Sequence, residues 1–494
     1  MVLVSKFTYF LFLFQILLNF IGSPLVQANF LLITVFVVLS LFLVERAKFL
    51  WILLTFILFE GQGRVVWGYH PLFRVIFDLI CFLYILKYLA KNKRIIPKNK
   101  INNISLLFIL LHFFWWLIEL LNPSGAGLFP SFATIKYYIF PLFLFFIFLN
   151  ESVKTNNREY QEQILKYFVI CILIFILCIY QNNVGIESVS NISDNYFTLF
   201  KKYGEFTTRD RFRPWGLSHA PGGMSVFMVL VLPFYFIFKP NLLTASRFKK
   251  LWFHFLNYLF IGLGFFSTFI SQVRSTFIKC ILIFTIASFI IFLANRSKFR
   301  SALITFLAII LLVVTFKDSE VIEEQSISAI NRFEALAEEG VLKQRGGFGE
   351  TINTVISHIE LPFGFGPGMT TGYLPAYEAR RKERFDIPSY AFWSLDNAYA
   401  FVFLELGLGA LFYLGFLFSL FFSLLSQIAK KFIRFKKNEH YQLAMVVSVF
   451  FLVVIIGNWG AVSFFFNPES FFLWYWIALA FNALGYLSSD SEQG

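Results

Sequence analysis

Long apolar runs separated by short polar segments dominate the amino-acid sequence. Because the hydrocarbon core of a bilayer is about 30 Å thick, a run of about 20 apolar residues can cross it as one helix. By this measure the sequence predicts about fourteen transmembrane helices. The predicted spans are 7–21, 25–44, 48–60, 71–90, 104–121, 132–149, 164–182, 220–238, 251–270, 275–293, 301–316, 397–426, 443–457 and 470–488. The pattern therefore predicts an all-α, polytopic membrane protein.

One long polar interval, residues 317–396, interrupts these runs. Apolar residues keep roughly helical spacing within 327–336 and 352–359, which predicts two amphipathic helices on the membrane surface. The Gly364–Gly368 stretch neither follows a strand nor opens a helix with a lysine, so it predicts a tight turn rather than a nucleotide-binding loop. The predicted domains are 1–316 with the helices before the loop, the large helical periplasmic loop 317–396, and 397–494 with the last helices and a cytoplasmic tail.

Composition agrees with a membrane location. Hydrophobic residues make up 58% of the 494 positions and charged residues only 14%, which is typical of polytopic membrane proteins. All four cysteines lie inside apolar runs, without the spacing of a disulfide framework or a metal site. No H-E-x-x-H or G-x-S-x-G signature occurs. We therefore predict neither a metal nor a cofactor.

Lys and Arg cluster in loops on one side of the predicted spans, and the net charge is +13. The positive-inside rule assigns that side to the cytoplasm, and both termini then lie inside. The basic clusters are 91–100, 247–250, 296–300 and 430–437. This distribution accounts for the charge without nucleic acid as a partner.

The first apolar run has a second interpretation as a cleaved signal peptide, because Lys6 precedes it. Such apolar regions are usually shorter and end at an A-x-A-like site, which Val26-Gln27-Ala28 does not provide. We predict an uncleaved first helix, and cleavage would leave the later topology unchanged.

Arginines mark two positions on the opposite, outer side. Arg209, Arg211 and Arg213 alternate with other residues, so they share one face of an extended segment. The helix that follows has Pro221 in its first turn, whose amides point outward. Arg274 ends a tight connection, 271–274, and must face water or a cavity. These features predict an anion site, the alternative being a loop that lies on lipid headgroups.

Three further residues are candidates, each with a simpler explanation. Lys136 lies early in an apolar span and can face a ligand or extend its amine to the interface. Asp396 directly precedes a helix and can act as a general base or as the cap of that helix. His219 is a histidine of the outer loops.

Five short motifs occur in a distinctive order. They are Arg213-Pro214-Trp215-Gly216, Ser271 to Ser275, Gly364 to Gly368, Asp396-Asn397-Ala398-Tyr399, and Glu405 to Gly409. In this order the layout, roughly residues 100–430, resembles the O-antigen ligase and O-antigen polymerase superfamily of bacterial membrane glycosyltransferases.

The resemblance implies a metal-independent transfer of glycan from a polyprenyl pyrophosphate lipid to a hydroxyl acceptor. The reaction would occur on the periplasmic face of the bacterial inner membrane. By position, Arg213 and Arg274 look like the family's pyrophosphate-binding arginines, and Arg211 and Lys136 are weaker candidates. Arginine suits this role because its planar fork pairs with phosphate oxygens and stays protonated.

Ligases of this family typically carry His-Asn where this chain has Asp396-Asn397. The difference favours a polymerase that extends O-antigen, exopolysaccharide or capsule on a saccharide acceptor, with Asp396 as the base and His219 as the other candidate. One alternative is a ligase that moves a finished glycan to a lipid A-core or protein acceptor. Another is a transporter or flippase of the same lipid-linked glycan. Such transporters often show internal repeats, which are not found here.

Overall fold

Helices make up all the regular structure in the described part of the chain. The computed structural model describes residues 2–68, 70–91, 101–150, 158–206, 212–220, 222–244, 246–271, 273–294, 361–370, 375–385, 397–435, 438–458, 464–465 and 468–492. Within these ranges, eight helices are long and apolar enough to cross a membrane. The all-α, multi-pass prediction is therefore confirmed. The fourteen-span count stays a prediction, because 301–316 and most of the 317–396 interval, including both predicted surface helices, lie outside these ranges.

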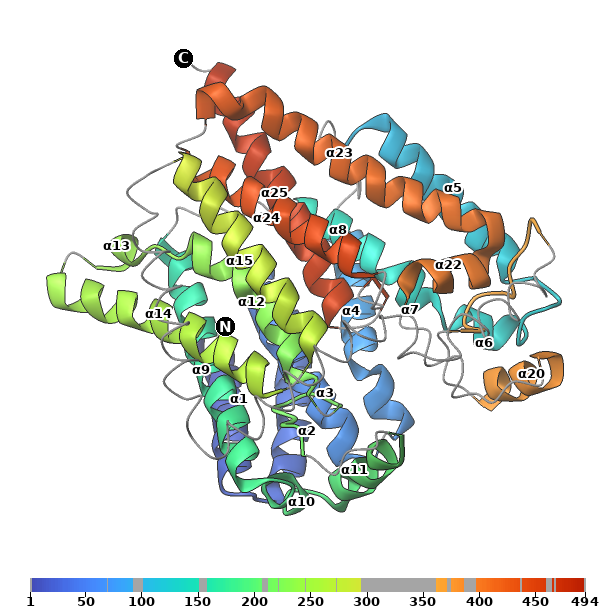
Figure 1. The fold of residues 1–494 in the computed structure, drawn as a ribbon, viewed down its shortest axis with the longest axis horizontal. Coiled ribbons are helices and arrows are strands. Elements are labelled where there is room, and N and C mark those ends of the chain that lie inside the picture. The colour runs from blue at the N-terminus through green and yellow to red at the C-terminus, as the bar shows by residue number, and fades with distance from the viewer. Residues whose placement is uncertain are drawn as a thin grey trace, which may run out of the picture. The chain divides into compact units, whose positions relative to one another are not determined.

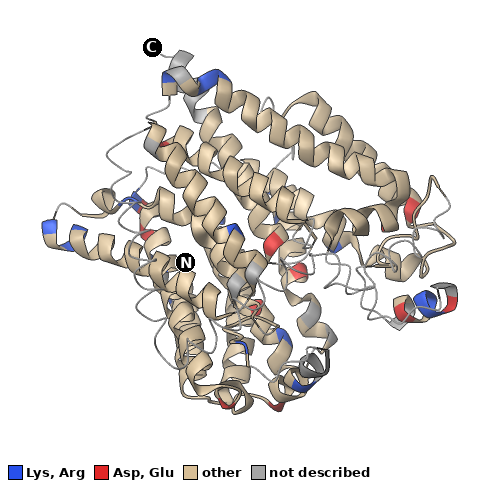
Figure 2. Cartoon of the chain, in the orientation of Figure 1, with Lys and Arg blue, Asp and Glu red and all other residues tan. Residues whose placement is uncertain are grey.

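The chain divides into two compact units, and each is described by itself. The first unit comprises residues 1–93 and 151–318, and the second comprises 94–150 and 319–494. In Figure 1 the first unit carries the dark blue and green helices and the second the orange and red ones. Figure 2 shows helices without charged residues along most of their length, with Lys and Arg at ends such as those of α14 and α23.

The first unit is built around α3 (Arg46–Val66), almost all of which is buried. Contacts join α1 to α2 and α9, α14 to α9 and α12, and α12 to α15. The remaining bounds are α1 Val2–Phe20, α2 Leu25–Leu43, α4 Pro71–Lys91, α9 Arg158–Val184, α10 Glu187–Ser190, α11 Asp194–Phe206, α12 Met224–Ile237, α13 Pro240–Leu243, α14 Arg247–Ile270 and α15 Arg274–Ala294.

The length of α3 differs from the short 48–60 span that hydropathy predicts. The helix continues for another turn and a half to Val66. The added segment contains Gln62 and Arg64 and directly follows Glu60, and these polar residues lower the mean hydropathy there. These polar side chains are paired within the unit, so the helix keeps them inside the protein.

A network of side-chain amides links three helices of the first unit. Gln62 of α3 accepts hydrogen bonds from Gln15 (2.9 Å) and Asn19 (3.2 Å) of α1, and donates to the Asn19 oxygen at 2.5 Å. Asn29 of α2 donates to Gln15 at 2.7 Å, and Gln62 also reaches the Tyr196 hydroxyl at 3.4 Å. All five side chains are buried. Because an unpaired amide in hydrocarbon is costly, the network fixes how α1, α2 and α3 pack.

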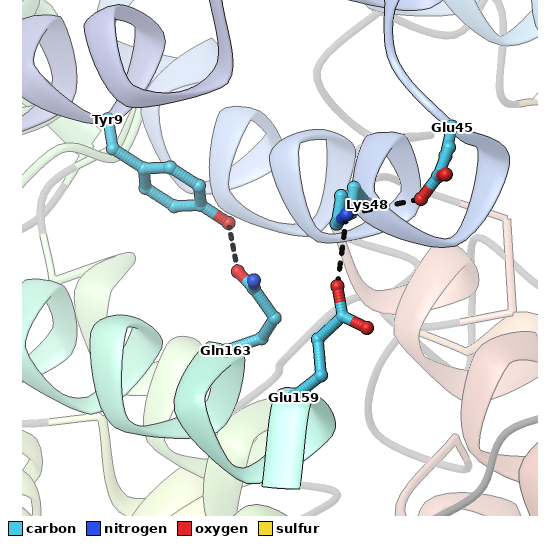
Figure 3. Close-up of polar contacts among 5 residues, drawn as sticks. All are labelled: Tyr9, Glu45, Lys48, Glu159 and Gln163. Carbon is cyan, nitrogen blue, oxygen red and sulfur yellow. Dashed lines mark hydrogen bonds and ion pairs between the residues drawn. The ribbon is translucent and has the colours of Figure 1, made fainter. Parts of the chain in front are cut away.

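Polar contacts near the start of α9 link this helix to α3 and α1 (Figure 3). Lys48 of α3 lies 3.1 Å from both Glu45 and Glu159, the latter at the start of α9. The Tyr9 hydroxyl donates to Gln163 at 3.3 Å. The charged groups are 39–70% exposed, so these ion pairs contribute little stability compared with the buried network.

The second unit packs α25 against α8 and α24, and α5 against α23. Figure 1 shows α5 running alongside the long α23. The bounds are α5 Asn103–Glu119, α6 Leu128–Phe132, α7 Ile135–Tyr138, α8 Phe140–Asn150, α20 Pro375–Phe385, α22 Ala398–Leu406, η1 Gly407–Gly409, α23 Ala410–Phe435, α24 Glu439–Gly457 and α25 Glu469–Glu492.

Two predicted spans of the second unit are interrupted helices. The 132–149 run divides into α7 and α8 around Ile139. The 397–426 run divides into α22, the 3₁₀ turn η1 and α23, with Gly407 at a left-handed φ of +53°. A Cβ atom at Gly407 would lie 2.4 Å from the Phe363 carbonyl carbon. The break therefore makes room for a second backbone segment, which hydropathy does not reveal.

Replacing Gln62 with leucine should lower the free energy of unfolding by about 2 kcal/mol, since four contacts at about 0.6 kcal/mol each disappear. The measurement is the thermal midpoint of the purified protein in detergent. Gln163→Leu is the control, because Gln163 is partly exposed and its contact is with Tyr9 at 3.3 Å. Equal losses in both variants would contradict a specific role for the amide network.

Candidate functional site

The predicted arginine site falls in the first unit. Arg213 and His219 are described with their side chains, whereas Arg274 is described only as the first residue of α15. Arg211 lies outside the described residues. We call residues 212–223 the arginine loop. It leads from the end of the preceding undescribed segment into α12.

The arginine loop closes on itself and meets the connection before α15. Gly222 donates its N–H to the Pro214 carbonyl at 3.0 Å, which brings the two ends of the loop together. Gly222 has a φ of +70°, and a Cβ atom there would lie 2.9 Å from the Ser271 carbonyl oxygen and 3.6 Å from Cδ of Arg213. Gly222 is therefore close both to the Arg213 side chain and to Ser271, three residues before Arg274. The separation of the two guanidinium groups stays a prediction.

Buried residues hold the middle of the loop. Gln181 of α9 accepts hydrogen bonds from the backbone N–H groups of Trp215 (3.0 Å) and Gly216 (2.7 Å). The Trp215 ring is fully buried and packs edge-on against Tyr196 at 5.0 Å between ring centroids. The loop is thus fixed to the helices at the residues that directly follow Arg213.

His219 lies against α3. A Cβ atom at Gly61 would be 2.7 Å from the backbone nitrogen of His219, so the close approach of the two backbones requires glycine. Arg64, one turn further along α3, shares the face of Gly61 and forms an ion pair with the buried Glu60. Burial, and after it the Arg64 charge, lowers the pKa of His219 to about 4. The imidazole is therefore neutral near pH 7 and a weaker proton acceptor than an ordinary histidine.

Arg64 is a charged residue of this site that the sequence reasoning missed. Its side chain is 21% exposed, whereas that of Glu60 is 3% exposed. The signal was present in the sequence as an acid and a base four residues apart near the end of an apolar helix.

Lys136 belongs to the second unit. It lies in the short helix α7, is partly exposed, and places its amine 5.0 Å from the centroid of the Tyr137 ring. This cation–π contact is one way in which an interfacial lysine is stabilised. A ligand-facing role for Lys136 stays a prediction.

A buried carboxylate organises a second constellation. We call residues 361–370 the glycine turn. Glu405 of α22 is fully buried and accepts four hydrogen bonds. The donors are the Tyr138 hydroxyl (2.6 Å), the Gly368 N–H (2.9 Å), the Thr370 N–H (2.8 Å) and the Thr370 hydroxyl (2.7 Å). Glu405 thus fastens the glycine turn to the membrane domain of this unit.

The glycines of this turn allow its backbone to contact α22 directly. Gly366 and Gly368 have φ values of +86° and +90°, which confirms the predicted tight turn. The Gly366 N–H donates to the Glu405 carbonyl at 3.1 Å, and a Cβ at Gly364 would lie 2.4 Å from that carbonyl oxygen. Glu119 of α5 accepts from the Gly364 N–H at 2.9 Å. The Gly364–Gly368 motif and the Glu405–Gly409 motif therefore contact each other directly.

Asp396, the proposed base, lies outside the described residues. The alternative that Asp396 caps the following helix is wrong, because Asn397 occupies the cap position of α22. The Asn397 side chain accepts hydrogen bonds from the N–H groups of Tyr399 (3.0 Å) and Ala400 (3.1 Å). Sequence spacing alone cannot choose between adjacent Asp and Asn, because both are good caps.

Comparisons of this chain with protein-family models, with curated proteins and with solved structures find no match.

Replacing His219 with glutamine should flatten the pH dependence of stability between about pH 6.5 and 4. The pKa falls from an ordinary value of 6.5 to about 4 on folding, so the unfolded chain binds more protons in this window. Stability is then full above pH 6.5 and declines as the pH falls toward 4. Thermal midpoints at a series of pH values measure the effect, with the exposed His70→Gln as control. The same decline in the wild type and in both variants would contradict the lowered pKa of His219.

Glu405→Gln should destabilise the second unit by about 3 kcal/mol, because a glutamine has one acceptor oxygen for four donors and its NH₂ faces a donor. Limited proteolysis near residues 361–370 and the thermal midpoint report the loss. Glu378→Gln, at an exposed position of α20, is the matched control and should behave as wild type. A turn that stays protected in Glu405→Gln would show that the carboxylate does not hold it.

Proposed function

We propose that this chain is a polymerase-type membrane glycosyltransferase. It would transfer saccharide units from a polyprenyl pyrophosphate to a saccharide hydroxyl, in O-antigen, exopolysaccharide or capsule synthesis. The observation that carries the proposal is the position of Gly222, where a Cβ atom would lie 3.6 Å from Cδ of Arg213 and 2.9 Å from the carbonyl oxygen of Ser271, three residues before Arg274. We infer from it that Arg213 and Arg274, far apart in sequence, lie close enough to bind one diphosphate.

The chemistry needs fixed positive charge. The acceptor hydroxyl attacks the anomeric carbon of the donor sugar, the bond from that carbon to the phosphate oxygen breaks, and polyprenyl pyrophosphate leaves with the bonding electrons. Negative charge grows on the phosphate oxygens, so arginines held there lower the barrier. Arg213 and Arg274 are the proposed partners, and Arg211 and Lys136 are weaker candidates.

A base must take the proton from the acceptor hydroxyl. Asp396 is the first candidate, because a carboxylate can accept it and the capping role at α22 belongs to Asn397. His219 is the second, and it is a weaker proton acceptor than an ordinary histidine because its pKa is lowered to about 4. No step of this scheme uses a metal ion.

We propose a location in the bacterial inner membrane with both termini in the cytoplasm and the arginine loop on the periplasmic side. The basic starts of α14, at Arg247, Lys249 and Lys250, and of α9, at Arg158, support that orientation. Ser271 directly follows the opposite end of α14, and the arginine loop is hydrogen-bonded to Gln181 near the opposite end of α9. A lipid-linked donor could then reach them from the outer leaflet.

The lipid-linked glycan pool of a deletion strain tests the proposal. Accumulation of single repeat units would support a polymerase. Full-length chains retained on the carrier lipid would instead indicate the ligase, whose family members typically carry His-Asn at 396–397. Accumulation on the cytoplasmic leaflet would indicate a flippase, and an unchanged pool would overturn all three.

Arg213→Lys and Arg274→Lys should each reduce glycan polymerisation by about 10²-fold, because the charge remains while the two-pronged pairing with phosphate is lost. Glycan chain length in cells with normal amounts of each variant is the measurement. Arg158→Lys is the control, since Arg158 is 71% exposed at the start of α9. Wild-type chain lengths in the Arg213 and Arg274 variants would contradict the arginine site.

A further inference from the structure

Gln181 is a fully buried glutamine in the last part of the membrane helix α9. Its side-chain oxygen accepts hydrogen bonds from two consecutive backbone N–H groups, those of Trp215 and Gly216. Its nitrogen donates to the Gly216 carbonyl at 3.4 Å. The amide thus replaces, at one point of the arginine loop, the backbone pairing that a helix or a sheet would supply.

The loop needs such a partner because it is irregular backbone inside an apolar unit. Trp215, Gly216 and Leu217 are all buried. Backbone N–H groups in such surroundings are costly unless they are paired. Gly216 has a φ of +57°, and a Cβ atom there would lie 2.9 Å from the Cys178 sulfur, one turn before Gln181. The loop therefore rests on one face of α9, formed by Cys178 and Gln181.

We propose that Gln181 is a positioning residue for Arg213. Arg213 lies only two residues before Trp215, so the bonds to Gln181 set where its backbone emerges from the unit. On this view Gln181 does not touch substrate and acts through the loop. The inference rests on the proposed role of Arg213 in binding a pyrophosphate.

The same helix offers a matched control. Gln161, at the other end of α9, is also fully buried. It accepts from the Lys239 N–H at 2.7 Å and donates to the Ile237 carbonyl at 3.1 Å. Gln161 therefore hydrogen-bonds to the backbone at the end of α12 and just after it, whereas Gln181 hydrogen-bonds to the backbone before α12. Loss of either glutamine removes comparable hydrogen bonds, but only Gln181 lies next to the arginine loop.

The experiment compares Gln181→Met, Gln161→Met, Gln181→Glu and Arg213→Lys in the full-length protein in nanodiscs. The probe is undecaprenyl pyrophosphate, and the readouts are its Kd and the hydrogen exchange of a peptide covering residues 212–220. Gln181→Met should speed exchange in that peptide and weaken binding about tenfold, because a displacement near 1 Å is enough to spoil a charged site. Gln161→Met should leave both unchanged. Gln181→Glu should keep much of the binding that Gln181→Met loses, since its carboxyl group keeps the acceptor oxygen.

The outcomes separate this inference from the function on which it rests. If Arg213→Lys binds the probe as wild type does, the pyrophosphate role of Arg213 fails, and the inference about Gln181 fails with it. If Arg213→Lys weakens binding but Gln181→Met does not, only the positioning role is overturned. Unchanged exchange in Gln181→Met, or equal loss of binding in Gln161→Met, would also overturn it.

Discussion

The structure depends on the need to pair every polar group that lies in hydrocarbon. Water cannot satisfy an amide or a carboxylate there, so each must find its partner within the protein. Helices meet this need for their own backbone. Irregular segments and polar side chains do not, and these are the places where the chain uses buried glutamine, asparagine and glutamate. Gln62, Gln181 and Glu405 are all buried and each makes at least three hydrogen bonds.

Each unit uses the same device to hold an irregular segment. In the first, Gln181 receives the N–H groups of the arginine loop. In the second, Glu405 receives those of the glycine turn. In both cases a glycine permits the close approach, Gly216 to α9 and Gly364 to α22, where a Cβ atom would overlap the neighbour. In both places, a buried hydrogen-bond acceptor on a helix and a glycine in the loop act together to hold the loop.

Hydropathy predicted the class of fold because lipid imposes it directly. Apolar runs such as 164–182 correspond to α9, and 443–457 to α24. It failed where polar groups are paired inside the protein, as in the last turns of α3. It also failed at Gly407, where the break in the helix depends on a segment some forty residues earlier in the sequence.

The candidate site was predictable only in part. Arginines near helix ends can be found from sequence, because a charge beside an apolar run needs an explanation. The closeness of Gly222 to both Arg213 and Ser271 could not be found, since it depends on a loop closure between Pro214 and Gly222. Nor could the lowered pKa of His219, which follows from burial and, after it, from the charge of Arg64.

Rigid support is what makes a loop arginine useful for the proposed chemistry. An arginine on a mobile loop would have to be ordered by the substrate, and part of the binding energy would be lost to that ordering. The arginine loop is instead ordered in advance by Gln181, by the buried Trp215 ring and by the contact with Gly61. Charge fixed before the donor arrives needs no reorganisation as the leaving group departs, and it stabilises the transition state more than the bound substrate. The same buried contacts that satisfy the loop backbone would thereby prepare the proposed site for an anion.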